Sequence, residues 1–272
     1  MAIVLDNITY TYGMGTPFEK TALRGVSLTI ENGEFLGVIG HTGSGKSTFV
    51  QHLNGLLHPT TGTVTVNGVD ISASTEEAKK MRHKVGMVFQ YPEHQLFEET
   101  IAQDIAFGPK NLGLSADDVD ERVRDAMKFV GLDYDTYAER SPFHLSGGQM
   151  RRVAIAGVVA MNPDFLVLDE PSAGLDPFGR EEIFEEIIRL HKEKGITVIL
   201  VSHNMEDISR MASRLVVLDK GRVVLDGEPM DIFNNHRDEL QAVGVDVPPV
   251  SVTMEYLREQ GFDVSNRVLS VD

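Results

Sequence analysis

The sequence predicts an α/β fold: a mixed sheet covered by helices, with a helical subdomain inserted into it and a small extension at its C-terminal end. Continuous apolar runs at residues 35–39, 165–168 and 196–201 are typical of buried strands, and polar or glycine-rich residues follow each of them. Helix-like stretches separate the runs, as in open α/β sheets. Residues 98–161 lack the alternation of strands and indicate several helices instead.

The composition limits the classes of function. The chain has 272 residues and a formal net charge of -16, which repels nucleic acid at long range, so we expect no nucleic-acid partner. It contains no cysteine, which excludes disulfides and thiolate chemistry. No apolar run approaches the roughly 18 residues of a membrane span, and the first residues do not resemble a signal peptide, so we expect neither segment.

The N-terminal part indicates β structure. Strands at residues 3–8 and 26–30 flank a turn-rich segment at residues 13–19. Two tyrosines, Tyr10 and Tyr12, precede that segment, in a place where an aromatic ring can stack on an adenine ring. Tyr12 is the better candidate because Tyr10 fits a position facing the core. The alternative is that Tyr12 is an ordinary strand residue.

A glycine-rich loop follows the strand at residues 35–39 and leads into a helix that we expect to end near Gly55. Its sequence, Gly-His-Thr-Gly-Ser-Gly-Lys-Ser, has the spacing of a P-loop, in which backbone amides and a helix N-terminus surround a polyphosphate. Lys46 is expected to reach the β and γ phosphates, and the Ser47 hydroxyl to bind Mg²⁺ in preference to that of Thr48. The expected nucleotide-binding residues of this loop are Gly40, His41, Thr42, Gly43, Ser44, Gly45, Lys46, Ser47 and Thr48.

The remaining elements follow from apolar periodicity and turn signals. Before the helical subdomain we expect a strand at 63–66, an Asn-Gly turn at 67–68, a helical stretch at 75–82 and a strand at 84–90 that ends in Gln90. Within the subdomain we expect helices at 98–107, 115–130 and 149–161. After it we expect a helix at 178–194, a hairpin of strands 215–218 and 222–225, and two short helices separated by Pro248 and Pro249.

Polar residues stand at the ends of two buried strands. Asp169 and Glu170 come just past the strand at residues 165–168, at the edge where open α/β sheets bind their ligands. Asp169 is expected to hold Mg²⁺ through water, and Glu170 to polarise the water that attacks the γ phosphate. His203 follows the next buried strand and is expected to reach the same phosphate. The alternative in each case is an ordinary polar residue at a strand end.

A second anion-binding segment lies at Leu-Ser-Gly-Gly-Gln, residues 145–149. Its glycines lead into the expected helix and offer free amides at a helix N-terminus, and Ser146 adds a hydroxyl. Its expected nucleotide-binding residues are Ser146, Gly147, Gly148 and Gln149. With the P-loop, Gln90, Asp169, Glu170, the loop Ser-Ala-Gly-Leu-Asp176 and His203 in this order, about residues 3–227 resemble the ATP-binding subunits of ATP-binding cassette (ABC) transporters.

This resemblance implies that two such domains pair head to tail and sandwich two ATP molecules. Each ATP then lies between the P-loop of one subunit and the Leu-Ser-Gly-Gly-Gln segment of the other. The resemblance also implies that Gln90 senses the γ phosphate and the membrane partner, with a place in catalysis and near Mg²⁺. It implies further that Asp176 lines the dimer interface and that Tyr12 stacks on adenine. All the core motifs are intact, so we expect an active ATPase.

A finer resemblance lies in residues 89–97, residues 149–157 and the tail around residues 243–249. These segments look like the energy-coupling factor (ECF) ATPases of prokaryotic vitamin and metal-ion importers, most of all their second type. The resemblance implies a second, related ATPase, a transmembrane scaffold and a membrane substrate-binding component as partners, and a peripheral place on the cytoplasmic face of the membrane. We expect an ABC domain at residues 1–227, its helical subdomain at about 98–161, and an extension at 228–272 that serves dimerisation.

Two other classes remain open at this point. One is an ABC ATPase without a transport role, as in DNA repair or on ribosomes, although the acidic charge and the lack of a coiled-coil insertion disfavour it. The other is a P-loop kinase or GTPase, which the segment at residues 145–149 disfavours. The transported substrate, the choice between homodimer and heterodimer, and the ATP stoichiometry stay open.

Overall fold

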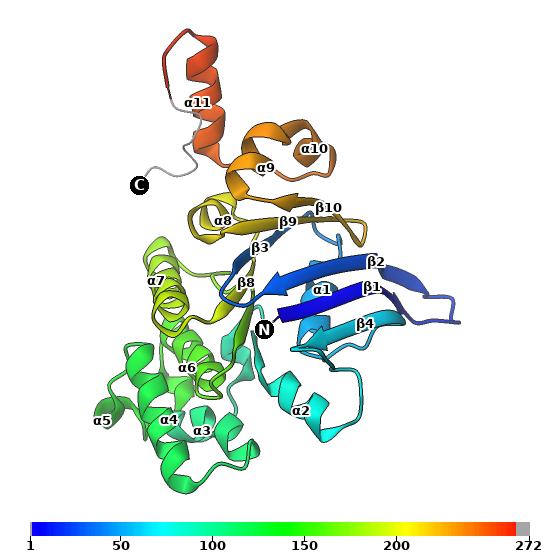
Figure 1. Ribbon diagram of the computed structural model, residues 1–272. Helices are drawn as coiled ribbons and strands as arrows, with labels where there is room; N and C mark the ends of the chain where they lie inside the picture. Colours follow the sequence, from blue (N-terminus) through cyan, green and yellow to red (C-terminus); the bar gives the residue numbers. More distant parts are fainter. Residues whose placement is uncertain (1, 265–272) are drawn as a thin grey trace. The chain divides into compact units, whose positions relative to one another are not determined.

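The computed structural model describes residues 2–264. The expected α/β class is confirmed, with strands and helices along the whole described chain (Figure 1). The strands are β1 (Ala2–Tyr12), β2 (Lys20–Glu31), β3 (Phe35–Ile39), β4 (Thr61–Val66), β5 (Val69–Asp70), β6 (Val85–Val88), β7 (Phe165–Asp169), β8 (Thr197–Val201), β9 (Arg214–Asp219) and β10 (Arg222–Gly227).

The helices account for most of the rest. The α-helices are α1 (Lys46–Leu53), α2 (Glu76–His83), α3 (Ile101–Asn111), α4 (Ala116–Phe129), α5 (Tyr134–Tyr137), α6 (Gly147–Val159), α7 (Pro177–Lys194), α8 (Met205–Met211), α9 (Pro229–Asn235), α10 (Arg237–Ala242) and α11 (Pro249–Glu259). Two short 3₁₀ helices are η1 (Pro92–Gln95) and η2 (Pro142–His144). No helix within residues 2–264 combines the length and the apolar character that crossing a membrane requires.

The chain forms two compact units, residues 1–82 with 197–272 and residues 83–196. The first unit contains the antiparallel strands β2, β1, β4 and β5 in that order. It also contains the strands β10, β9, β3 and β8, which are neighbours in that order, and β3 runs parallel to β8 and β9. Both β3 and β8 are buried along their whole length, as their continuous apolar sequences predict.

Close packing fixes α8 against β3 in the first unit. A Cβ atom added to Gly37 would lie 3.0 Å from Ile208 Cγ2 and 3.2 Å from Ala212 Cβ, so the helix approaches this strand as closely as a glycine allows. Helix α9 packs on β9, β10 and α8. Beyond it, Arg237 on α10 pairs with Glu255 on α11, and the two helices border a hollow of about 480 Å³.

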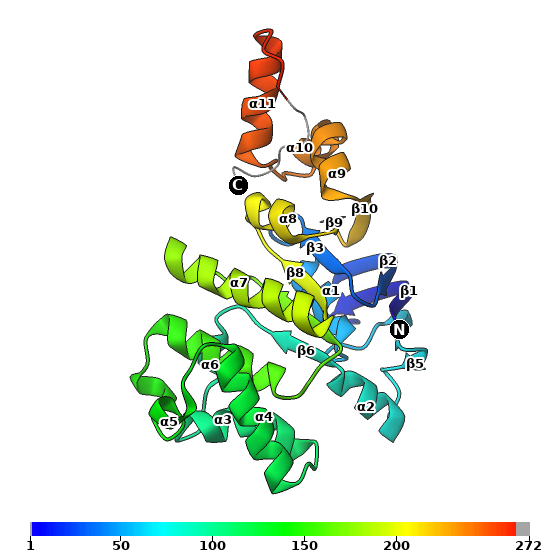
Figure 2. The same ribbon diagram turned by 60° about the vertical axis from the view of Figure 1, so that its left-hand side comes forward.

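The second unit pairs β6 with β7 in parallel and adds the helices of the expected subdomain. Helices α3, α4 and α6 lie side by side in both views (Figures 1 and 2). A Cβ on Gly86 of β6 would lie 2.6 Å from Val158 Cγ1, so α6 packs tightly on this strand. The helical prediction for this region is therefore right, and Ser115 caps α4 by accepting a hydrogen bond from the amide of Asp118 at 3.2 Å.

The structure corrects several boundaries. The helix expected from residue 149 begins at Gly147, because Ser146 caps it and both glycines fall in its first turn. The strand expected at 84–90 spans only Val85–Val88, so Gln90 lies in the loop beyond it. The C-terminal extension contains α9, α10 and α11 rather than two helices. Neither α5 nor α8 was expected. The limits of the helical subdomain at about residues 98–161 and the end of the ABC domain at residue 227 stay predictions.

A buried carboxylate in the second unit makes stability depend on pH. Glu186 on α7 lies 3.8 Å from Arg152 on α6, and its Oε2 has no hydrogen-bond partner among residues 2–264. Burial raises the pKa of Glu186 to about 7, above its usual 4.5, although the charges of Arg152 and Arg189 oppose this. Two neighbouring carboxylates, Glu182 and Glu185, add to the rise.

We expect the free energy of unfolding of Glu186→Gln, relative to that of the wild type, to be higher in alkaline than in acid solution. The native carboxyl keeps a proton that the unfolded chain releases, so the free energy of unfolding of the wild type falls as pH rises from about 4.5 to about 7. The variant lacks this loss. Its free energy of unfolding relative to the wild type should therefore be roughly 1–3 kcal/mol higher at about pH 8 than at about pH 5. Urea unfolding at both pH values measures it. Glu193→Gln, at an exposed site on the same helix and outside the set of charges that act on Glu186, is the control. An equal pH dependence in wild type and Glu186→Gln would contradict the assignment.

Candidate nucleotide site

The glycine-rich loop of the first unit joins β3 to α1, and two glycines shape it. At Gly40, with φ +151°, a Cβ atom would lie 2.3 Å from the carbonyl oxygen of Leu218. At Gly45, with φ +110°, it would lie 2.9 Å from that of Ala22. Glycine is therefore required at both places, because the loop is pressed against the backbone of β2 and β9.

The polar side chains at the start of α1 differ in exposure. Lys46 is only 6% exposed, and its Nζ donates hydrogen bonds to the carbonyl oxygens of Gly40 at 2.6 Å and His41 at 3.1 Å. Its ammonium is therefore held inside the loop. Ser47 is exposed, whereas Thr48 is buried. The Ser47 hydroxyl is thus the more accessible of the two, and its role as a ligand of Mg²⁺ stays a prediction.

Aromatic packing orients the tyrosine pair at the end of β1. The rings of Tyr10 and Tyr12 meet edge to face at 4.8 Å, and Tyr10 meets the ring of His52 in the same way at 4.9 Å. His52 is fully buried on α1, and this burial lowers its pKa although a hydrogen bond to the Thr48 carbonyl opposes the shift. Tyr12 is 41% exposed, and its hydroxyl lies 3.1 Å from that of Thr48. The ring of Tyr12 is accessible, and adenine stacking by it stays a prediction.

His203 lies at the same sheet edge as the glycine-rich loop. The neighbouring strands β3 and β8 run in parallel, and Val38 of β3 is opposite Val201 of β8. Gly40 and His203 each follow this register pair by two residues. The His203 side chain is exposed. Its loop is held because the Ser202 hydroxyl accepts from the Asn204 amide at 3.0 Å and the Asn204 side chain caps α8.

The second unit brings the other strand-end residues together. Val88 of β6 is opposite Leu168 of β7, so Gln90 and Glu170 each follow this register pair by two residues. Asp169 is the last residue of β7 and is 7% exposed. Glu170 has φ +53°, a left-handed conformation that is uncommon for a side-chain-bearing residue and occurs often at functional sites. The roles of these three residues stay predictions.

A buried arginine joins three segments of the second unit. Arg151 on α6 is 1% exposed, and its guanidinium donates to Glu93 Oε2 at 3.1 and 3.2 Å. It also donates to the carbonyl oxygens of Pro171 at 2.8 Å and Ala173 at 2.9 Å. The segments that follow β6 and β7 are thereby tied to α6. Sequence reasoning did not single out this residue; the available signal was an arginine next to buried apolar positions of one helix.

The N-terminus of α6 is open. The amide of Gln149 donates to the Ser146 hydroxyl at 3.3 Å, and the Gln149 side chain accepts from the Ser146 amide at 3.1 Å, forming a capping box. A Cβ atom on Gly147 or Gly148 would meet no atom of residues 2–264 within 4 Å. Packing among these residues therefore does not explain the two glycines, which weaken the helix that they begin. The helix end is left accessible to a group outside the chain.

Asp176 begins the next long helix. Its side chain accepts from the Gly179 amide at 2.7 Å and caps α7, and the residue is exposed. The expected site residues therefore fall into two sets. Those of the glycine-rich loop, with Tyr12 and His203, belong to the first unit. Gln90, Asp169, Glu170, Asp176 and residues 146–149 belong to the second.

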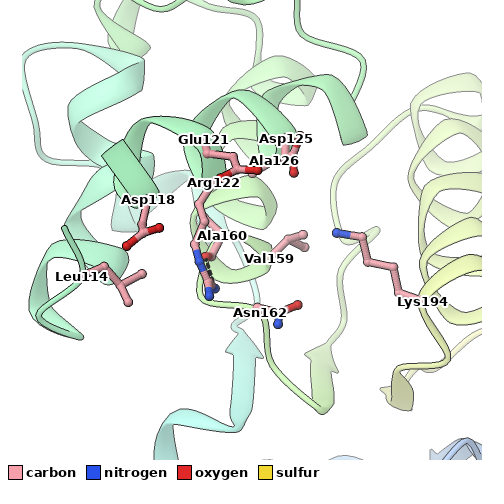
Figure 3. A pocket seen from close by; sticks show the side chains of 10 residues that line it. All are labelled: Leu114, Asp118, Glu121, Arg122, Asp125, Ala126, Val159, Ala160, Asn162 and Lys194. Carbon is pink, nitrogen blue, oxygen red and sulfur yellow. Dashed lines mark hydrogen bonds between the residues drawn. The ribbon is translucent and has the colours of Figure 1, made fainter. Parts of the chain in front are cut away.

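A hollow in the second unit lies away from these motifs. It measures about 450 Å³ and is bordered by α4, the end of α6 and Lys194 (Figure 3). Arg122 in this hollow donates to the Ala160 carbonyl oxygen at 3.1 Å. None of the expected site residues lines it.

Comparison with known proteins decides the family. The profile of the ABC transporter family matches residues 23–173. The "Energy-coupling factor transporter ATP-binding protein EcfA2" of Clostridium tetani is 54% identical over 272 residues, which is 100% of this chain and 94% of the relative. The chain belongs to the ECF transporter ATPases of the ABC family. As a member of this family it is an ATP-hydrolysing subunit of an ECF transporter, so the resemblance and the ATPase activity expected from the motifs are confirmed.

Two solved structures agree with this assignment. The cbiO1 protein of Clostridium perfringens, described as part of the ABC transporter complex cbiONQ, is 36% identical with a TM-score of 0.77 and covers 93% of this chain and 98% of its own. The dimeric cassette MJ0796, described in a post-hydrolysis state with ADP and Pi, is 32% identical with a TM-score of 0.73. The match covers 84% of this chain and 98% of the MJ0796 chain. ATP is thus the nucleotide of this ECF ATPase, and the alternative without a transport role is not favoured.

Proposed function

We propose that this ECF ATPase drives the uptake of a vitamin or a transition-metal ion through a separate transmembrane scaffold and a membrane substrate-binding component. The observation that carries the proposal is similarity along the whole chain to a protein named as an ECF transporter ATP-binding protein. In this function the chain binds and hydrolyses ATP at the cytoplasmic face of the membrane, and the scaffold holds it there.

The residues of the first unit bind the nucleotide. The amides of the glycine-rich loop and the Lys46 ammonium hold the β and γ phosphates, since the loop leads into the N-terminus of α1, where free amides and the helix dipole favour an anion. Tyr12 stacks on the adenine ring, and its accessible face and its contact with Thr48 support this role. His203 donates a hydrogen bond to the γ phosphate from the same sheet edge.

The donor set fits Mg²⁺. Ser47 offers an exposed hydroxyl, Asp169 a carboxylate and Gln90 a side-chain amide oxygen, and Mg²⁺ prefers such oxygen ligands together with substrate phosphates. Within residues 2–264 there is no cluster of three or more His, Cys, Asp or Glu residues that could hold a metal ion. Bound Mg²⁺ would neutralise charge on the phosphates. Glu170 accepts the proton of the attacking water.

The ATP site is completed by a second ATPase subunit. The open N-terminus of α6, with Ser146 and the two glycines, supports an approach of the γ phosphate held by the partner chain. Asp176 lies at this head-to-tail interface. We infer a related but different ATPase as the partner, with a homodimer as the second possibility, and we assign residues 228–272 to dimerisation; residues 265–272 of this extension lie outside the described residues.

A pull-down from native membranes in mild detergent tests the proposal. We expect mass spectrometry to find a scaffold with several membrane spans and a second related ATPase, and any substrate-binding component would identify the cargo. The control is an unrelated peripheral membrane protein with the same tag. Recovery of only soluble proteins or ribosomes would contradict the transport role.

A further inference from the structure

The turn between β9 and β10 supports the glycine-rich loop from one side. The carbonyl oxygen of Leu218 fills the space in which a Cβ of Gly40 would lie, at 2.3 Å. At the other end of the turn, the amide of Gly221 donates to the Ser44 carbonyl oxygen at 2.8 Å. The backbone of this turn therefore meets the loop near its beginning and in its second half.

A side-chain pair lies between these two backbone contacts. His41 Nε2 is 2.9 Å from Asp219 Oδ1, and His41 Nδ1 is 2.8 Å from the Thr42 carbonyl oxygen. Carboxylate and carbonyl oxygens only accept hydrogen bonds, so both ring nitrogens face acceptors. The ring is thus fixed at both nitrogens, one of them by Asp219.

Burial shows which partner anchors the pair. The Asp219 side chain is 16% exposed and that of His41 is 36% exposed. Lys220 lies 3.6 Å from the other Asp219 oxygen, but its side chain is 83% exposed and contributes little. The carboxylate sits at the end of β9, a strand paired with β3, so it is held by the sheet, whereas His41 belongs to the loop itself.

The C-terminal extension also reaches this place. Gly244, which follows α10, has φ +68°, and a Cβ added to it would lie 3.9 Å from His41 Cβ. The segment that joins α10 to α11 therefore passes over the histidine. In Figure 1 this segment belongs to the orange part of the chain that follows β10.

We propose that Asp219 is a positioning residue for the nucleotide: through His41 it holds the glycine-rich loop in the shape that receives the ATP phosphates. The inference rests on the proposed function, because it takes this loop as the phosphate site. In this role Asp219 acts through His41. Its loss loosens the loop, so it weakens binding of the phosphates and leaves contacts to the base unchanged.

Calorimetric titration of the full chain with a non-hydrolysable ATP analogue and with tripolyphosphate tests this inference. Asp219→Asn should weaken binding of both probes by about fivefold, the range of a partly exposed charge pair. Asp226→Asn is the matched control, because Asp226 is in the same hairpin and binds Arg214 at 2.7 Å instead of the loop. It should bind both probes as the wild type does.

Variants of His41 separate positioning from a general effect on the hairpin. In the His41→Ala background, Asp219→Asn should cause no further loss, since the pair acts as one unit. Three results would each overturn the inference: unchanged binding in Asp219→Asn, an undiminished loss in the His41→Ala background, or an equal loss in Asp226→Asn. Lys46→Ala distinguishes failure of this inference from failure of the proposed function. If that variant bound tripolyphosphate as tightly as the wild type, the glycine-rich loop would not be the phosphate site.

Discussion

Replacing Glu170 by Gln is expected to stop ATP turnover while ATP binding remains. Glutamine keeps the size and polarity of the side chain but cannot accept the proton of the attacking water. General base catalysis contributes about 10²- to 10⁴-fold, so phosphate release should fall by at least about two orders of magnitude. The φ of +53° at this residue indicates that the local fold maintains an unfavourable conformation to hold the side chain there.

Phosphate release and binding of a labelled ATP analogue, measured on the same preparation, check this expectation. Glu185→Gln makes the same chemical change at an exposed site on α7 and should leave both quantities unchanged. ATPase activity near the wild-type level in Glu170→Gln would exclude Glu170 as the general base. A parallel loss of ATP binding would show that its role is in holding the nucleotide.

The second large effect concerns stability. Glu93→Ala should lower the free energy of unfolding by about 3–5 kcal/mol, because it leaves the buried Arg151 guanidinium without its counter-charge. The hydrogen bonds to the Pro171 and Ala173 carbonyl oxygens neutralise no charge. Urea unfolding of the full chain measures the loss.

A double variant separates the cost of an isolated charge from the value of the pair. Glu93→Leu combined with Arg151→Met replaces both charges by apolar groups of similar size, and buried pairs exchanged in this way often cost little stability. We expect this double variant to be more stable than Glu93→Ala. A loss below about 1 kcal/mol in Glu93→Ala would contradict the assignment, because it would place Arg151 in contact with water.

The sequence predicted the strands and loops that a short stretch of neighbouring residues determines. The strands β3, β7 and β8 are continuous apolar runs, and the glycine-rich loop follows the first of them. Boundaries were wrong where a cap decides them. Ser146 caps α6, so this helix starts at Gly147, two residues before the expected start at residue 149, and the capping box with Gln149 fixes this start. The short α5 and α8 carry too few periodic positions to be recognised.

Contacts between distant residues could not be predicted in this way. His41 and Asp219 are 178 positions apart, and Arg151 and Glu93 are 58 positions apart. Each pair is brought together by strand order and helix packing, which no local pattern encodes. The motifs named the residues expected to touch ATP, whereas the side chains that hold those motifs in place became visible only in the folded chain.

The position of Gly244 over His41 has a thermodynamic consequence. Whatever binds the extension and shifts this segment changes the affinity of the loop for ATP by some factor, and linkage requires that ATP change the affinity for that binder by the same factor. If the binder is the second ATPase, nucleotide affinity and dimer affinity form one closed cycle. Measuring either equilibrium with and without the other ligand then gives the same coupling free energy.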